Sequence, residues 1–231
     1  MQFRIFACLI ILTFTSCQGN KEQEREINDL VTTGPTEDII EDVIPIDMRI
    51  EQIDGEAIPL DCDYDGYLFD CWRWEDTEGV NYLFRTLEEP RDDSEDSPED
   101  YVFIDEYLHV YHYRKTSRDE MMLIRELTDF IKDCEFDSNV SHLAEVELTD
   151  VDQDYIGEVT FGYRLACRSD VSPSDQKVIL FEDGEKYILR GTSEVYGYGG
   201  DYEAGAEFDD ANPDFLYQVA AYWDKYKVEF E

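Results

Sequence analysis

The sequence has few basic residues. It contains 19 lysines and arginines against 57 aspartates and glutamates, which gives a formal net charge of −38. A chain of this charge repels nucleic-acid phosphates and anionic lipid head groups. We therefore expect no nucleic-acid partner.

Sequence motifs of several enzyme classes are also missing. The chain has no glycine-rich phosphate-binding loop, and no G-x-S-x-G motif surrounds Ser169, Ser172 or Ser174. No two cysteines have the C-x-x-C spacing of many metal sites. These absences leave the chain without evident catalytic machinery, so a non-enzymatic function is favoured.

Histidine is scarce, with three in the chain. His109 and His112 are three residues apart in a segment with strand-like composition, which places them on opposite faces of a strand. His142 is isolated in the sequence. We interpret all three as structural residues rather than as ligands.

No apolar run reaches the roughly 20 residues needed to span a bilayer. The longest, Ile5 to Phe14, follows the basic Arg4 and precedes small residues, which is the pattern of a secretory signal peptide over residues 1–16. The end of this segment, Thr15-Ser16-Cys17, resembles a bacterial lipobox and predicts lipidation of Cys17. The alternative is an ordinary signal peptide with an incidental cysteine.

Residues 17–45 are polar and acidic and almost free of aromatic residues, so we predict a flexible tether. Loss of residues 1–16 removes Arg4 and no acid, which changes the net charge to −39. Acidic residues behind a lipidated cysteine resemble the export signal of Gram-negative surface lipoproteins. The expected location is the outer membrane or the cell surface, with the periplasmic face as an alternative.

Residues 46–231 predict a single β-rich globular domain. The 16 tyrosines, 13 phenylalanines and 3 tryptophans of the chain supply material for a core. Short alternating segments predict antiparallel sheets with hairpins that turn at Gly79 and at Asp183-Gly184, and a central strand over 102–115. The stretch 119–134 fits neither the helical nor the strand period, and 90–101 reads as a solvated loop.

The C-terminal stretch has a different period. Phe215, Val219, Tyr222, Trp223 and Tyr226 recur at helical spacing after Asn212-Pro213, a pair typical of a helix start. We predict one amphipathic C-terminal helix that packs on the sheets, so the fold class is mainly β with α+β character.

Four cysteines lie in the predicted domain, and export to an oxidising compartment favours disulfides. Three pairings are possible. We favour Cys62 with Cys71, closing one hairpin, and Cys134 with Cys167, tying two later strands together.

An acidic stretch, Asp150-x-Asp152-x-Asp154 followed by Glu158, is the leading candidate site. Oxygen ligands at these positions of a turn can converge on one hard cation such as Ca²⁺. Against calcium, Tyr155 occupies the position where such loops favour a glycine with a left-handed backbone. The alternative interpretation is a solvated acidic turn between two strands.

Three weaker candidates complete the set. The run Asp61-x-Asp63-x-Asp65 has a following glycine but no glutamate at the ninth position. Paired carboxylates in so acidic a chain leave open a glycan-active enzyme. Tyrosines beside flexible glycines, which can stack on sugar rings, are Tyr196, Tyr198 and Tyr202.

Several segments together resemble a small family of bacterial lipoproteins associated with surface polysaccharide biosynthesis. The resemblance covers roughly residues 65–226 and is strongest in the aspartate turn that leads to the "CRSDVSPSD" block. Two departures are Tyr155, in place of the glycine usual in that turn, and Arg168, where the family has a histidine.

The resemblance implies a lipid-anchored envelope protein that binds or helps assemble surface polysaccharide, and it supplies no catalytic residues. The membrane, through the lipid, and polysaccharide or envelope proteins are the expected partners. No cofactor is required, although Ca²⁺ is a candidate ligand. The alternatives are a glycan-active enzyme and a calcium-stabilised structural or interaction module.

The lipobox interpretation predicts the behaviour of Cys17→Ser. Without the acceptor thiol the protein should be soluble or should accumulate as an unprocessed precursor, because acyl chains on Cys17 supply the anchor. Membrane fractionation followed by mass measurement of the N-terminus checks this. Mature Cys17→Ser protein in the membrane fraction would contradict the interpretation.

Overall fold

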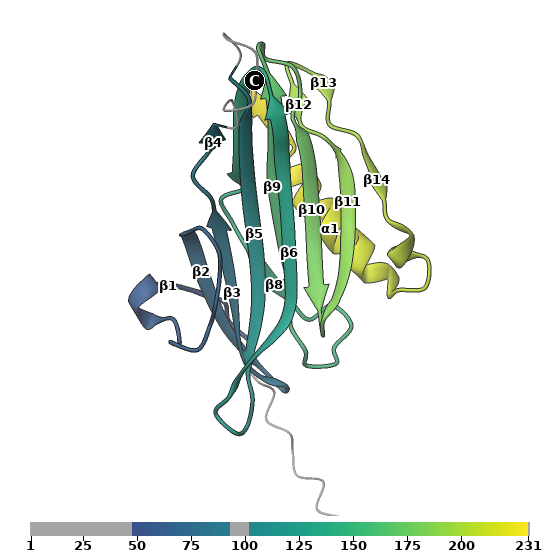
Figure 1. The fold of residues 1–231 in the computed structure, drawn as a ribbon. Coiled ribbons are helices and arrows are strands. Elements are labelled where there is room, and N and C mark those ends of the chain that lie inside the picture. The colour runs from purple at the N-terminus through teal and green to yellow at the C-terminus, as the bar shows by residue number, and fades with distance from the viewer. Residues whose placement is uncertain (1–47, 93–101, 231) are drawn as a thin grey trace, which may run out of the picture. The chain divides into compact units, whose positions relative to one another are not determined.

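A computed structural model describes residues 48–92 and 102–230 of the protein (Figure 1). The predicted signal peptide, the lipidated Cys17 and the tether lie outside the described residues, as does most of the loop at 90–101. The described residues belong to one compact unit, Ile44–Glu231. Within them, no helix combines the length and the apolar character needed to cross a membrane.

Sheet A has the strand order β1-β2-β3-β5-β4, with β6 paired to the other side of β5. Its strands are β1 (Glu51–Ile53), β2 (Tyr67–Asp76), β3 (Gly79–Leu87), β4 (Arg91–Asp92), β5 (Ile104–Lys115) and β6 (Met121–Cys134). The stretch that fitted neither period is thus a strand, β6, whose pairing with β5 is interrupted by a register shift at His112/Tyr113. This shift explains why its apolar residues do not alternate cleanly.

Sheet B has the order β14-β11-β10-β9-β7, with β8 also paired to β9. Its strands are β7 (Asp137–His142), β8 (Glu147–Thr149), β9 (Glu158–Arg168), β10 (Asp175–Glu182), β11 (Glu185–Thr192) and β14 (Tyr202–Ala204). A small third sheet contains β12 (Glu194–Val195), β13 (Tyr198–Gly199) and β15 (Val228–Phe230). Every pairing in sheets A and B is antiparallel, which confirms the predicted fold class.

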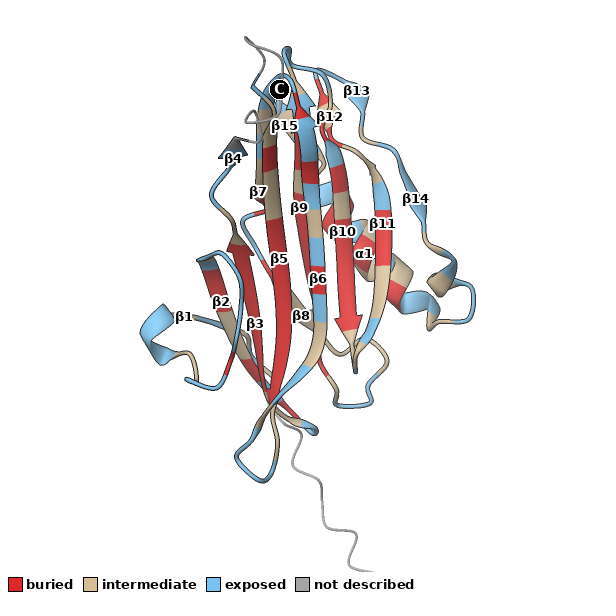
Figure 2. Ribbon diagram, viewed as in Figure 1, coloured by how far each residue is buried: buried red, intermediate tan, exposed pale blue. Residues whose placement is uncertain are grey.

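The two large sheets pack face to face over the main core, visible as the buried central positions of β3, β5 and β10 in Figure 2. Side chains from both sheets meet there, because alternate residues of each strand point inward. The fully buried members are Trp74, Leu83, Leu108, Val110, Val159, Phe161, Ile179 and Phe181. The predicted central strand β5 thus faces apolar side chains on both of its sides, since Tyr111 and Tyr113 belong to a second cluster on the outer face of sheet A.

Helix α1 (Pro213–Tyr226) covers the outer face of sheet B (Figure 1). The Asn212 side chain caps its start by accepting a hydrogen bond of 3.1 Å from the Asp214 N–H, and Pro213 follows at the first helical position. Phe215, Val219 and Trp223 are buried against β10 and β11. The predicted amphipathic helix is confirmed. Two 3₁₀ helices, η1 (Gly55–Ala57) and η3 (Ala206–Phe208), complete the described elements.

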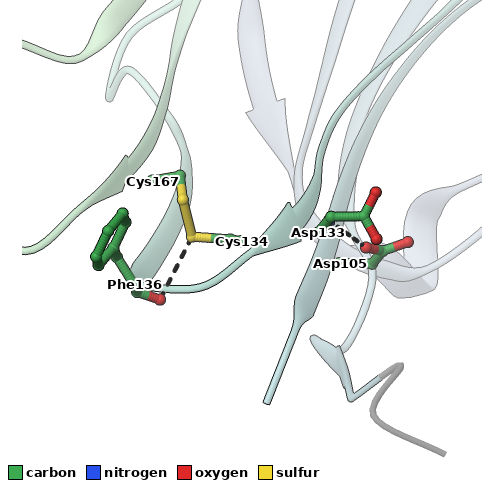
Figure 3. Close-up of a disulfide and its surroundings, with 5 residues drawn as sticks. All are labelled: Asp105, Asp133, Cys134, Phe136 and Cys167. Atoms are coloured by element: carbon green, nitrogen blue, oxygen red, sulfur yellow. Dashed lines mark hydrogen bonds between the residues drawn. A yellow bond between two sulfur atoms is a disulfide. The ribbon is translucent and has the colours of Figure 1, made fainter. Parts of the chain in front are cut away.

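A disulfide joins Cys134 at the end of β6 to Cys167 near the end of β9 (Figure 3). Since β6 belongs to sheet A and β9 to sheet B, the bond links the two layers of the sandwich. Next to Cys134 in β6, the Asp133 N–H donates to Asp105 of β5 over 2.9 Å. The predicted Cys134–Cys167 pairing is confirmed.

The predicted Cys62–Cys71 bond is wrong: both residues are free, buried thiols. The two do not close a hairpin, because Cys62 lies in the segment before β2, and the hairpin partner of β2 is β3. Both pack in the apolar cluster on the outer face of sheet A. Burial raises the pKa of Cys62 to about 11 and also raises the pKa of Cys71, so both thiols are unreactive at neutral pH.

Replacement of both Cys134 and Cys167 by serine should lower the free energy of unfolding by about 3 to 4 kcal/mol, because the bond closes a loop spanning 33 positions. Urea unfolding with and without reductant measures this difference. The control is Cys62→Ser, which removes a free thiol and should leave the response to reductant unchanged. Equal stability of the double variant and the oxidised parent would contradict the expectation.

Candidate functional site

The acidic turn connects β8 to β9 and has an unusual backbone. Gln153 and Tyr155 have φ values of 64° and 67°, in the left-handed region that non-glycine residues rarely adopt. Tyr155 therefore takes the conformation for which a glycine was expected, and its bulk does not prevent the turn. The chain bends so that Asp150 Oδ1 accepts from the Tyr155 N–H at 3.3 Å and Asp154 Oδ1 accepts from the Ile156 N–H at 2.8 Å.

The turn brings carboxylates together in two triads that share Asp152. Oxygens of Asp150, Asp152 and Glu158 lie within 4.8 Å of one another, and so do oxygens of Asp152, Asp154 and Glu182. Of the four carboxylates predicted from the sequence, Asp150, Asp152 and Glu158 thus form one triad, and Asp154 belongs to the other. Such oxygen clusters can hold a metal ion.

Glu182 is the member that the sequence did not indicate. It stands at the end of β10, where the pairing of Phe181 with Val159 places the next residue, Glu182, across from Glu158. The sequence does predict a strand that ends just before the Asp183-Gly184 hairpin turn. The pairing of that strand, β10, with β9 is also needed to bring Glu182 to the acidic turn. Glu182 completes the second triad, with Asp152 and Asp154.

Burial and mutual repulsion disfavour the charged carboxylates. Glu158 is fully buried, and both of its oxygens lie 3.1 Å from the Val151 N–H, which donates to them. Burial raises the pKa of Glu158, and burial together with the Asp154 charge raises that of Asp152. Burial, followed by the charges of Asp152 and Asp154, raises the pKa of Glu182 to about 7. A bound cation would offset both the burial of these charges and their mutual repulsion.

The turn rests on the β2–β3 hairpin of sheet A. The N–H and the hydroxyl of Thr77 both donate to the Tyr155 carbonyl, at 3.1 and 2.9 Å. The Gly157 N–H donates to Asp76 Oδ2 over 3.3 Å. A Cβ at Gly157 would lie 2.9 Å from the indole nitrogen of Trp74, so only glycine permits this approach. These contacts fix the loop before any ligand binds.

The second acidic run does not form a comparable cluster. Within the described residues, the carboxylates of Asp61, Asp63 and Asp65 belong to neither metal-capable triad. Their backbone instead anchors the segment to sheet A, where the Tyr113 hydroxyl donates to the Asp63 carbonyl at 2.7 Å and the Asp65 N–H donates to the Tyr111 hydroxyl at 3.1 Å. The run is a structural connection.

The three histidines make hydrogen bonds within the protein. His109 contacts Glu88 at 3.0 Å and Thr128 at 2.9 Å on the outer face of sheet A. His112 lies on the opposite face against Trp74, as predicted, with its Nε2 3.0 Å from Asn81. The Nε2 of His142 is 3.1 Å from the Thr86 carbonyl. Burial lowers the pKa of each imidazole.

A groove of about 570 Å³ is the second candidate site. Strands β10, β11 and β14 form its floor, where Lys177 and Arg190 lie on adjacent strands in register. Tyr202 also borders it, but its side chain lies on the other face of sheet B, where it contacts the buried Trp223 of α1 with 5.3 Å between ring centroids. The charged and polar side chains on its floor suit a ligand that offers hydroxyl groups.

The predicted tyrosine set is therefore divided. Tyr196 and Tyr198 are 60% and 75% exposed and do not line this groove, whereas Tyr202 does. Arg168, the departure from the family pattern, forms an ion pair with Glu229 of β15 and donates to the Ser172 carbonyl. Ser174 donates to the same glutamate at 2.7 Å. The "CRSDVSPSD" block therefore holds the C-terminal strand.

Searches for related protein families, for characterised relatives and for similar solved structures find no match.

The raised pKa of Glu182 gives a pH prediction for the metal-free protein. The folded state holds this proton up to about pH 7, whereas the unfolded chain releases it near the ordinary value of 4.5. The contribution of Glu182 is thus present below pH 4.5 and is lost as the pH rises to about 7. In chelator, Glu182→Gln should reduce the decline in stability across this window.

Urea unfolding at several pH values measures the decline. The matched control is Glu185→Gln, which removes one exposed carboxylate from the other side of the same hairpin turn. Identical slopes for Glu182→Gln and the parent would show that Glu182 titrates as an ordinary exposed carboxyl group.

Proposed function

We propose that the protein is a lipid-anchored envelope protein that binds surface polysaccharide without catalysing a reaction on it. The observation that carries this proposal is the groove with the hydrogen-bonding side chains of Lys177, Arg190 and Glu203 on its floor. The export and anchoring part of the proposal rests on the sequence of residues 1–17. The expected location is the outer membrane or the cell surface.

The groove has the chemistry that sugars require. Sugar hydroxyl groups both donate and accept hydrogen bonds, so they can bind the carboxylates and the guanidinium group that line the groove. The groove volume also falls within the range of roughly 300–1,000 Å³ typical of ligand sites.

A second function, binding of Ca²⁺ by the acidic turn, is favoured by the two triads around Asp152. Calcium accepts six to eight oxygen ligands with flexible geometry, which suits carboxylates spread over one turn and a neighbouring strand. The ion would neutralise groups that repel one another and would secure the turn between β8 and β9. Its role in this proposal is structural.

Arg190→Ala should weaken binding of surface polysaccharide extracted from the producing cell about tenfold, the equivalent of ~1.4 kcal/mol, because it removes a guanidinium donor from the floor of the groove. Isothermal titration calorimetry on the full mature chain measures this loss. Arg118→Ala, at an exposed position between β5 and β6, is the matched control. The size distribution of the polysaccharide should not change during incubation, since shortening of the chains would favour the glycan-active enzyme instead.

Calcium should raise the melting temperature more than magnesium at equal ionic strength, because a ligand that binds only the folded state stabilises it. At tenfold excess over the dissociation constant the gain is about 1.4 kcal/mol. Asp152→Ala should abolish the calcium-specific part. The control Asp210→Ala, which removes an exposed charge outside both triads, should keep it. Identical melting curves in calcium, magnesium and chelator would make the stretch an acidic turn only.

A further inference from the structure

The two carboxylate triads of the acidic turn have one residue in common. Asp152 contributes to both, while Asp150 and Glu158 belong only to the first triad, and Asp154 and Glu182 only to the second. Each triad thus combines two aspartates of the turn with one glutamate from a strand. Because the oxygens of each triad lie within 4.8 Å of one another, each triad can supply three ligands to a cation of its own.

The strand register brings the two glutamates to the same face of sheet B. Glu158 of β9 pairs with Thr149 of β8 and stands across from Glu182 of β10. Leu180, two residues before Glu182, packs in the apolar cluster under α1, so this row of side chains lies on the α1 face of the sheet. Val151 of the acidic turn packs in the same cluster. The turn therefore folds over the row that contains both glutamates.

The three aspartates use one oxygen each to hold the backbone of the turn. Oδ1 of Asp150 accepts from the Tyr155 N–H, and Oδ1 of Asp154 accepts from the Ile156 N–H. Oδ1 of Asp152 accepts from the Asp154 N–H over a longer 3.4 Å. Among the hydrogen bonds between described residues, none of these aspartates uses Oδ2, which leaves that oxygen to a cation.

Two buried hydroxyl groups near Glu158 have no hydrogen-bond partner of ordinary geometry within the described residues. They belong to Thr149, directly across from Glu158, and to the fully buried Thr160, two residues along β9 on the same face. Burial raises the pKa of Glu158, and the Thr149 hydroxyl beside it partly offsets that rise. Buried polar groups need partners, so these oxygens indicate a ligand, bound directly or through a water. Calcium accepts both kinds of oxygen ligand.

One divalent cation leaves the cluster strongly negative. The five carboxylates of the two triads carry a charge of −5 when all are ionised, so one Ca²⁺ leaves −3 and two leave −1. Two divalent cations repel about four times as strongly as two unit charges at the same separation. A carboxylate shared by both ions offsets this repulsion, because its negative charge lies close to each of them. Asp152 is the residue in that position.

A single ion held by all five carboxylates is the competing arrangement. Calcium ligands lie roughly 2.3–2.6 Å from the ion, so two ligands of one ion are at most about 5 Å apart. Oxygens within each triad meet this limit, but the five residues do not form one group within 4.8 Å. The geometry therefore suits two ions better than one.

We infer that the acidic turn binds two calcium ions, one in each triad, with the carboxylate of Asp152 shared between them. This inference rests on the proposed binding of Ca²⁺ and specifies its stoichiometry and ligands. The first triad binds its ion more tightly, since it contains the fully buried Glu158, where attraction is less weakened by water. The second triad contains the exposed Asp154 and binds the weaker ion, which connects the turn to the end of β10.

Calorimetric titration of the full mature chain with calcium chloride, after removal of bound ions by a chelator, counts the sites. Salt at about 0.15 M screens the diffuse attraction of calcium to the remaining surface charge. We expect two ions per chain, with dissociation constants that differ by at least about tenfold. Equilibrium dialysis against radioactive calcium gives an independent count.

Amide variants assign the ions to the triads. Asp150→Asn should remove only the tighter ion, Glu182→Gln only the weaker ion, and Asp152→Asn both, because its carboxylate is shared. The matched control is Glu185→Gln, an exposed residue across the same hairpin turn and outside both triads, which should still bind two. Each amide keeps the side-chain shape and relieves repulsion, so melting temperatures in chelator should equal or exceed that of the parent.

The number of bound ions separates this inference from the proposed function. One ion per parent chain, lost alike in all three triad variants, would overturn the two-ion arrangement, while calcium binding by the turn would stand. Two ions that persist in Asp152→Asn would overturn the shared ligand. Absence of calcium-specific binding in the parent would overturn the proposed calcium binding as well.

Discussion

A buried arginine makes the contact between the two sheets on which the position of the acidic turn depends. Arg85 of β3 is fully buried, forms an ion pair with Asp70 on the neighbouring strand β2, and donates to the carbonyls of Leu143 and Ala144 at 2.6 and 3.3 Å. Those carbonyls lie between β7 and β8 of sheet B. A buried guanidinium is tolerated only when its donors are satisfied. The position of the segment leading to β8, and hence to the acidic turn, follows from this requirement.

A second buried polar network, centred on Asp76, holds the acidic turn itself against sheet A. Asp76 accepts from the indole of Trp74 at 3.2 Å, from Asn81 at 2.9 Å and from the Gly157 N–H. Asn81 in turn accepts from Arg114 at 3.0 Å. Polar groups removed from water must be paired, so this network of hydrogen bonds fixes the start of β9 against sheet A. The carboxylates of the turn thus converge because the scaffold holds them, despite their repulsion.

The sequence predicts best what depends on neighbouring residues. The helix start at Asn212-Pro213 and the hairpin at Asp183-Gly184 are local signals, and both are confirmed. Glu182 escaped notice because its place at the acidic turn depends on the pairing of β9 with β10. The free thiols of Cys62 and Cys71 were missed for a related reason: an even number of cysteines says nothing about which pairs the packed chain brings together.

Because basic residues are scarce, those used in the interior determine how much negative charge remains at the surface. Arg85 and Arg114 are buried in polar networks, and Lys177 and Arg168 are held in ion pairs that join separate strands. These cations are already held by partners in the fold, so they leave most of the remaining acidic residues without a counter-charge. The surface therefore keeps most of the charge of the 57 acidic residues. Ligands that suit such a surface are cations, which neutralise the carboxylates, and uncharged ligands with hydroxyl groups, which donate hydrogen bonds to them. Both candidate sites of this protein are of that kind, because its composition leaves few others.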